Sequence, residues 1–315
     1  MRLLFFGTPD FAVPTLVRLA EHPDHQVVTV VSQPNRPKGR GRKLHPSPVS
    51  AEALARELPL LRPERVGEPD VADALRATEP DLGIVVAFGQ FLPKRIRELP
   101  SRGYLINAHA SLLPRHRGAA PIHRAILAGD AETGISVMRV EREMDAGAVE
   151  SVVRTPIAPG DTGGELTERL SVLAADAIAA ALERIAAGRD QWEEQDAGLA
   201  TEAPKLGSED QDLPWDEPAS ALARRIWALA PTPGARCWLD ETPLRILAAV
   251  PEDAALPGPP GRIQREGDVL RVATGNGALR LERLQRAGGK PLHTDAFLRG
   301  RAIEDGTVLR GRPTG

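Results

Sequence analysis

The sequence has little cysteine, no long apolar run and almost no net charge. Cys237 is the only cysteine among 315 residues, so a disulfide within the chain is impossible and a cysteine-based metal site is not expected. No stretch approaches about 18 uninterrupted apolar residues, the length that a membrane span needs. Asp10 interrupts the apolar start too early for a signal peptide. We therefore expect a cytosolic enzyme whose contacts to nucleic acid, if any, depend on a local patch, because the formal net charge is only -3.

A dinucleotide-binding fingerprint is also missing. The first apolar run, at 2–6, is followed by GTPDFAVP at 7–14, which lacks the GxGxxG spacing. Pro14 suits the first turn of a helix, where a missing N–H costs little. The start of the chain thus predicts a strand, a turn and a helix without a nicotinamide site.

The first half of the chain alternates apolar runs with helix-like segments. Continuous apolar strands interleaved with helices are typical of an α/β domain with a Rossmann-like, mostly parallel sheet. In such a sheet, ligands bind beyond the carboxyl ends of the strands. The expected strands lie at 2–6, 25–32, 81–88, 104–109, 133–141 and 148–157, and the longest expected helix lies at 164–188.

In the last third of the sequence, the long helix-like segments give way to short apolar runs. Short strand-like runs separated by Gly, Pro and Asp-rich turns predict a small, OB-like β-barrel. We therefore expect a catalytic domain at 1–190, a linker at 191–208 and a C-terminal β-barrel domain at 209–315.

The stretch INAHASLLPRHRGAAPI at 106–122 carries an unusual density of polar side chains after an apolar strand. Asn107 and His109 stand at alternate positions, so both side chains project from one face of the strand. An imidazole can accept a proton near pH 7, and an amide can donate to a developing oxyanion. Asp145, in the later turn MDAG, could orient the histidine. These groups suit acyl transfer to an amine, although an isolated histidine at such a place more often only satisfies the end of the strand.

The motif Asn-x-His-x-Ser-Leu-Leu-Pro, with a nearby Gly and a later Asp, resembles the signature of folate-dependent formyltransferases. The resemblance implies that Asn107, His109 and Asp145 form a catalytic trio, that 10-formyltetrahydrofolate is the donor, and that no metal is needed. It also implies a folate site with two parts. The matching lining residues are Ser111, Leu112, Leu113 and Pro114, and the residues near the pteridine, in the loop at 87–93, include Phe88, Gly89 and Gln90.

Within this family, GTPDFAVPTL at 7–16 is similar to the N-terminal signature of members that act on methionyl-tRNA. The segment between 34 and 46 has five basic residues and no acidic one, and a basic insertion there resembles the element with which such members hold the tRNA acceptor stem. From Arg262 onward, 11 basic residues stand against 6 acidic ones, which favours a phosphate-binding surface on the barrel. The candidate tRNA contacts are Arg36, Lys38, Arg40, Arg42, Lys43 and Lys290.

The resemblance therefore predicts formyl transfer from 10-formyltetrahydrofolate to the α-amino group of methionyl initiator tRNA. A formyltransferase for an amino-sugar nucleotide would share the trio without needing the basic elements, and a catalytically idle tRNA-binding module would not need the trio. The basic segment could also be a plain solvated loop. His22, His25 and His293 are expected at the surface, and the sequence leaves the roles of Arg115 and Arg117 open.

Overall fold

The computed structural model describes residues 1–38 and 43–311, except for the side chain of Lys38. The chain forms two compact units. The first comprises residues 1–121, 133–155 and 167–203, and the second comprises residues 122–132, 156–166 and 204–315. Residues 191–203 of the expected linker thus pack with the first unit.

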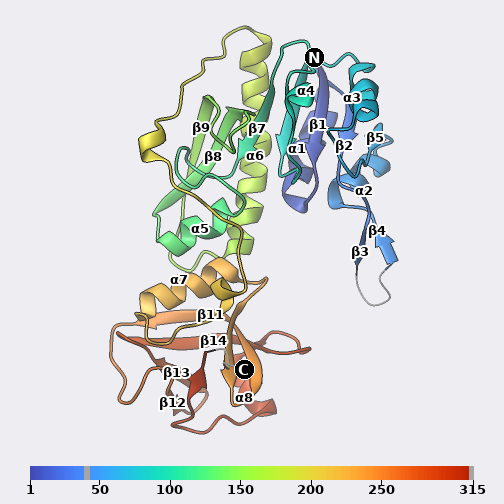
Figure 1. The fold of residues 1–315 in the computed structure, drawn as a ribbon. Coiled ribbons are helices and arrows are strands. Elements are labelled where there is room, and N and C mark those ends of the chain that lie inside the picture. Colours follow the sequence, from blue (N-terminus) through green and yellow to red (C-terminus); the bar gives the residue numbers. More distant parts are fainter. Residues whose placement is uncertain (39–42, 312–315) are drawn as a thin grey trace. The chain divides into compact units, whose positions relative to one another are not determined.

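The first unit is built on one seven-stranded sheet (Figure 1). In spatial order its strands are β5 (Leu60–Leu61), β2 (Gln26–Val31), β1 (Arg2–Gly7), β6 (Leu82–Val86), β7 (Leu105–His109), β8 (Glu132–Arg139) and β9 (Val149–Pro156). Neighbouring strands from β5 to β7 pair in parallel, and β8 runs antiparallel to β7. The predicted Rossmann-like, mostly parallel sheet is confirmed.

Helices cover both faces of this sheet, which explains the continuous apolar strands. Leu4 and Phe6 alternate with Leu3 and Phe5 along β1, and all four side chains are fully buried. Leu4 and Phe6 belong to a core cluster with residues of α3 and α4. The helices in the described residues of both units are α1 (Val13–Ala20), α2 (Pro48–Ala55), α3 (Pro69–Arg76), α4 (Lys94–Arg97), α5 (Pro121–Ala128), α6 (Gly163–Ala186), α7 (Ala219–Leu229) and α8 (Thr294–Gly300). Of these, α7 and α8 lie wholly in the second unit.

The second unit contains a curled antiparallel sheet, so the expected β-barrel class is confirmed as a half-barrel. In spatial order its strands are β12 (Ile263–Glu266), β13 (Val269–Ala273), β14 (Ala278–Arg286), β11 (Thr242–Glu252), β10 (Ala235–Leu239) and β16 (Leu309–Arg310), and β15 (Leu292–His293) pairs with β14. Leu222 and Ile226 of α7 pack on the inner face of this sheet in one apolar cluster. Within the described residues, no helix is both long enough and apolar enough to cross a membrane.

Candidate active site

Asn107 and His109 come from β7, whose carboxyl end lies beside that of β6 in the parallel part of the sheet. Asn107 stands opposite Met138 of β8, and His109 stands opposite Ser136. His109 is 6% exposed. Asn107 is half-buried, and within the part of the chain that the structure describes its amide bonds to no protein group. An accessible and unengaged amide is available to a ligand.

The imidazole of His109 is held by the backbone of the following loop. Its Nε2 lies 2.8 Å from the carbonyl oxygen of His116. A carbonyl oxygen only accepts hydrogen bonds, so Nε2 carries a proton and Nδ1 is the basic nitrogen of the neutral ring. Nδ1 lies 3.5 Å from Oδ2 of Asp145. The one nitrogen that can take up a proton therefore faces a carboxylate.

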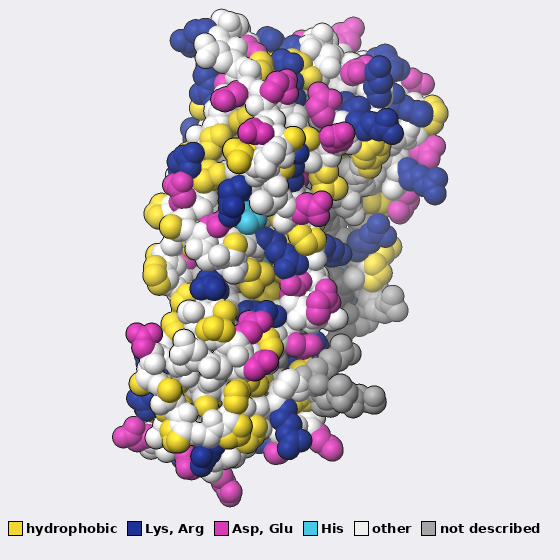
Figure 2. All heavy atoms as spheres, turned by 60° about the vertical axis from the view of Figure 1, so that its left-hand side comes forward, with side chains coloured by type: hydrophobic (Ala, Val, Ile, Leu, Met, Phe, Trp, Pro, Cys, Tyr) yellow, Lys and Arg dark blue, Asp and Glu magenta, His cyan; other side chains and the backbone are white. Residues whose placement is uncertain are grey.

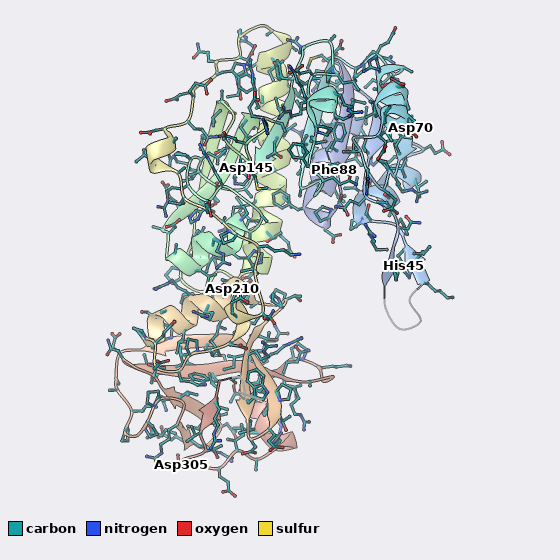
Figure 3. The ribbon with its side chains drawn as sticks, viewed as in Figure 1. His45, Asp70, Phe88, Asp145, Asp210 and Asp305 are labelled. Carbon is teal, nitrogen blue, oxygen red and sulfur yellow. The ribbon has the colours of Figure 1, made fainter. Side chains whose placement is uncertain are left out.

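Asp145 lies in the turn between β8 and β9 (Figure 3). Its φ of 53° places it in the left-handed region, which few non-glycine residues adopt. Its Oδ2 atom accepts a hydrogen bond of 2.9 Å from the backbone N–H of Gly118, and its side chain is 15% exposed. Residues far apart in the sequence thus bring the imidazole, the carboxylate and a backbone donor together at the end of β7.

A segment that sequence reasoning treated as a linker runs along this site (Figure 1). Arg117 donates its backbone N–H to Thr201 and accepts from Ala203 through its carbonyl, at 2.8 and 2.6 Å. The hydroxyl of Thr201 accepts from the backbone N–H of His116 at 2.9 Å. We call residues 193–203 the strap. Nothing in its polar composition indicated that it would pack on the motif at 106–122.

The side chain of Gln195 joins the strap to the loop at 116–118 and to the turn that contains Asp145. Arg117 donates to its Oε1 from Nε and Nη2, at 3.0 and 2.7 Å. Gln195 in turn donates from Nε2 to the carbonyl oxygens of Asp145 and Gly147, each at 2.8 Å. The guanidinium of Arg117, whose role the sequence left open, is thus engaged with the strap.

The residues expected to line the folate site differ in what they expose. Ser111 is fully buried, and its hydroxyl donates to the carbonyl of Arg115 at 2.6 Å. The side chains of Leu112, Leu113 and Pro114 are half-buried and leave apolar surface exposed. Ser111 therefore shapes the loop, and any apolar wall comes from the three residues after it.

The loop at 87–93 follows β6 and shows a similar division. Phe88 is 2% exposed, and its ring packs edge-on against Phe6. Its carbonyl oxygen accepts hydrogen bonds from the hydroxyl of Thr8 and from Nε2 of Gln33, at 2.8 and 3.1 Å. Gly89 has a φ of +81°, and Gln90 bonds the backbone of Val66 and Pro63. Phe91 is 68% exposed and was not among the candidates.

The basic candidates lie on two separate elements. Arg36 stands on β3 (Arg36–Lys38), and Lys43 stands on β4 (Lys43–His45), which form an antiparallel hairpin. Arg36 lies 3.9 Å from Glu64, with both side chains mostly exposed, and Lys43 is exposed. Arg40 and Arg42 lie outside the described residues, as does the side chain of Lys38. Lys290 is exposed in the second unit. Figure 2 shows a face on which acidic and basic side chains are interspersed.

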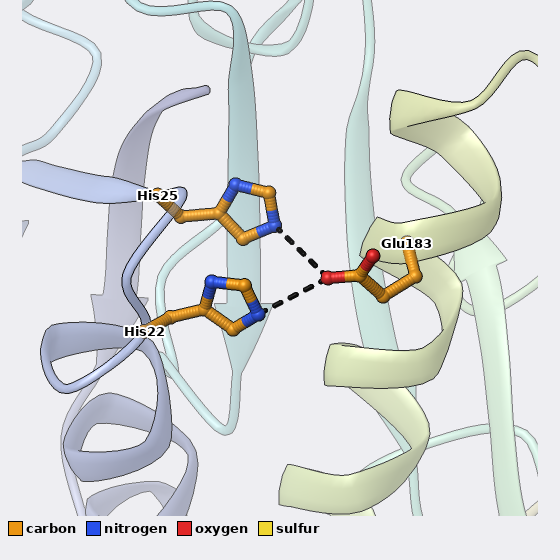
Figure 4. Close-up of side chains that lie close together, drawn as sticks. All are labelled: His22, His25 and Glu183. Atoms are coloured by element: carbon orange, nitrogen blue, oxygen red, sulfur yellow. Dashed lines mark ion pairs between the residues drawn. The ribbon is translucent and has the colours of Figure 1, made fainter.

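Three ionisable residues meet away from this site, between the α1–β2 connection and α6 (Figure 4). Nε2 of His22 and of His25 lie 3.1 and 3.9 Å from Oε1 of Glu183. The side chain of His25 is only 3% exposed, so its expected surface position is wrong, whereas His293 is exposed as expected. His25 is buried because its ring stacks on His22 and lies 3.2 Å from the N-terminal amine.

The spacing of these three residues could suit a metal ion, but their other contacts do not favour one. Nδ1 of His22 accepts from the backbone N–H of Asp24, which leaves the proton of the neutral ring on Nε2, the atom that a metal would need. The two rings are stacked with 17° between their planes, so their Nε2 atoms lie in separate, nearly parallel planes. Burial, then His22 and the N-terminal amine, lower the pKa of His25. We interpret the group as a link between the α1–β2 connection and α6.

Comparison with known proteins identifies the family. Residues 1–182 match the family model described as formyl transferase, and residues 205–302 match the one described as formyl transferase, C-terminal domain. The chain belongs to the formyl transferase family. This formyltransferase is 45% identical over 312 residues to the methionyl-tRNA formyltransferase of Pseudomonas syringae pv. tomato, a match that covers 98% of both chains. The predicted family membership and the prediction of an enzyme are confirmed.

Solved structures share the fold of this formyltransferase at low sequence identity. An N-formyltransferase from Helicobacter canadensis, in complex with folinic acid and dTDP-3-aminofucose, matches 90% of this chain and 98% of its own, with a TM-score of 0.67 and 13% identity. HypX from Aquifex aeolicus, in complex with tetrahydrofolic acid, matches with a TM-score of 0.63 and 17% identity, and this chain spans 51% of that longer protein. Both likenesses concern the fold alone.

Proposed function

We propose that this formyltransferase moves the formyl group of 10-formyltetrahydrofolate to the α-amino group of methionyl initiator tRNA. The observation that carries the proposal is the meeting of an unengaged amide, a basic imidazole nitrogen and a carboxylate at the end of β7. The acceptor is supported by the similarity to proteins named methionyl-tRNA formyltransferase, and the donor by the folates bound to two proteins of the same fold.

Asn107 and His109 take complementary parts in the attack. The amine attacks the formyl carbon directly, and the carbonyl oxygen becomes an oxyanion in the tetrahedral intermediate. The amide of Asn107 donates a hydrogen bond to that oxygen. Nδ1 of His109 takes a proton from the attacking amine, because Nε2 is already protonated and bonded to His116. The imidazolium that results lies beside Asp145, which stabilises it.

The proton balance closes without another reactant. The new bond joins the amine nitrogen to the formyl carbon, and the bond between that carbon and N10 of the folate breaks. Nδ1 of His109 then returns its proton to the departing N10, so the imidazole ends neutral. The carboxylate of Asp145 exchanges no proton in this sequence and is held in place by the hydrogen bond that Gly118 donates from its backbone.

The donor pocket lies between the loops that follow β6 and β7. The half-buried side chains of Leu112, Leu113 and Pro114 provide an apolar wall for the pteridine ring. On the opposite side, the backbone of Gly89 and Gln90 provides hydrogen-bonding groups. Phe88 supports this loop from below, because it is buried and its carbonyl oxygen already accepts from Thr8 and Gln33. No metal ion is part of this proposal.

The acceptor tRNA is held by basic side chains through its phosphates. The hairpin of β3 and β4 presents Arg36 and Lys43, and the sequence between them adds Lys38, Arg40 and Arg42. Lys290 is the corresponding candidate in the second unit.

One pair of incubations tests the choice of acceptor. The purified enzyme is given 10-formyltetrahydrofolate with either methionyl initiator tRNA or a dTDP-linked amino sugar, and each product is identified by mass spectrometry. We expect N-formylmethionyl-tRNA and an unchanged sugar nucleotide. If the sugar were formylated and the aminoacyl-tRNA stayed unchanged, the proposed acceptor would be wrong, whereas the proposed chemistry of Asn107, His109 and Asp145 would stand.

A further inference from the structure

The side chain of Gln195 bonds through one amide both to Arg117, in the motif loop after β7, and to the backbone of the Asp145 turn. The guanidinium of Arg117 has only donors, and the carbonyl oxygens of Asp145 and Gly147 only accept. The amide can therefore face them in one orientation alone, with Oε1 toward Arg117 and Nε2 toward the turn.

The Asp145 turn needs such a support. Its left-handed φ of 53° at Asp145 is an unfavourable conformation for a residue with a side chain. The turn also packs closely at Gly147, where only glycine fits, because an added Cβ would collide with the carbonyl oxygen of Arg139. With its carbonyls at 145 and 147 both bonded to Gln195, the turn is held at the two positions that flank Ala146.

The same amide fixes the opposite side of the site through Arg117. The loop at 116–118 carries the carbonyl that orients His109 and the N–H that binds Asp145. Arg117 is the central residue of this loop, and its backbone pairs with the strap at Thr201 and Ala203. A movement of Gln195 would therefore change the separation of His109 and Asp145 from both sides.

We infer that Gln195 is a positioning residue for formyl transfer, which keeps Oδ2 of Asp145 beside Nδ1 of His109. The inference rests on the proposed function, since it assigns Gln195 a part in that chemistry. Gln195 touches neither reacting group directly and acts through the turn. A displacement of about 1 Å in such a site can lower a rate on the order of 100-fold.

The main test replaces Gln195 by a side chain of similar length that cannot hydrogen-bond. Gln195→Met should lower kcat on the order of 10-fold to 100-fold, with KM for tRNA and for the donor unchanged. Gln191→Met is the matched control, because Gln191 is exposed on the same stretch of chain, and it should keep the wild-type rate. Wild-type kcat in Gln195→Met would overturn the inference.

Two further variants separate positioning from a general loss of structure. Gln195→Glu keeps an acceptor for Arg117 but loses both donors to the turn, so it should be as slow as Gln195→Met. If Gln195→Glu kept the wild-type rate, the bonds to the Asp145 turn would not matter, and Gln195 would serve only to anchor the strap to Arg117, which would contradict the inference. Because Gln195 acts through Asp145, Gln195→Met should slow Asp145→Asn no further. Multiplicative losses in the double variant would contradict the inference.

Amide hydrogen exchange supplies a readout that needs no substrate. The amides of residues 145–148 should exchange faster in Gln195→Met than in the wild type, while those of β1 should not change. Equal exchange in the turn would overturn the positioning role. If Asp145→Asn itself kept the wild-type rate, the proposed mechanism would be wrong. The exchange measurement would still test the positioning role of Gln195, because it does not depend on that mechanism.

Discussion

At the scale of single residues, Asn107 gives the cleanest prediction because its amide bonds to no described protein group. Asn107→Ala should lower kcat on the order of 100-fold to 1,000-fold, the usual loss for one oxyanion donor. The melting temperature should stay near that of the wild type, since the substitution removes no hydrogen bond within the described protein. Steady-state kinetics and a thermal melt of the same sample check both statements. Unchanged kcat would assign the oxyanion to another donor.

The lowered pKa of His25 predicts that the stability of the fold depends on pH. The pKa of His25 is lowered in the folded protein, by burial first and then by His22 and the N-terminal amine, while a hydrogen bond with the backbone of Asp24 and the charge of Glu183 act in the opposite direction. The unfolded chain therefore binds this proton more readily than the folded one, and folding stability falls as the pH drops below about 6.5. His25→Gln should show a flatter decline of melting temperature from pH 8 to 5.5, whereas His293→Gln should follow the wild type. Equal slopes in both variants would contradict this assignment.

The positions of Asn107 and His109 could be predicted from the sequence because alternation on a strand fixes the face on which side chains project. The burial of His25 could not, since it depends on a stacked ring and a chain terminus brought beside it. Phe88 and Gln90 were chosen by their place in a motif, yet their side chains pack on Phe6 and bond to Val66. A motif locates a loop but does not say which of its groups remain exposed.

At the scale of elements, the strap and the loop at 116–118 are packed too closely for a side chain at Gly118. Its φ is +126°, and an added Cβ would lie 2.8 Å from the carbonyl oxygen of Ala203. Gly118→Ala should therefore destabilise the fold by about 1–3 kcal/mol and lower kcat, since its N–H binds Asp145. Gly103→Ala is the matched control: it also has a positive φ, but nothing lies within 4 Å of the added Cβ.

Denaturant unfolding and kinetics of the two glycine variants distinguish these effects. Gly103→Ala should lose stability only through its backbone conformation and should keep the wild-type kcat. Equal losses of stability and equal rates in the two variants would show that the strap does not constrain the loop at 116–118.

The strands and the long helix could be predicted because each shows its own apolar pattern. The strap could not, because it is joined to the first unit by backbone hydrogen bonds at Arg117 and by the side chains of Gln195 and Thr201, which leave no pattern of apolar residues. The division into units shows the same limit. Residues 122–132 and 156–166 group with the C-terminal part through tertiary contacts, although their sequence is continuous with the first unit.

At the scale of the whole molecule, the formal charge of -3 offers no general attraction for tRNA, so binding must depend on local basic side chains. Replacing Arg36, Arg40, Arg42 and Lys43 together by Ala should weaken tRNA binding and reduce the slope of log K against log salt by about 0.7–0.9 for each phosphate that is no longer neutralised. Binding of a folate analogue should not change. Filter binding at several salt concentrations measures the slope, and an unchanged slope would assign tRNA binding to other residues.

The central claim is that the site at the end of β7 transfers a formyl group to methionyl-tRNA with Nδ1 of His109 as the base. The most direct measurement is the single-turnover rate of formyl transfer from 10-formyltetrahydrofolate, in the wild type and in His109→Ala, with tRNA binding measured on the same samples. We predict N-formylmethionyl-tRNA from the wild type, a rate on the order of 100-fold to 10,000-fold lower in the variant, and unchanged tRNA affinity. A variant rate equal to that of the wild type would contradict the account.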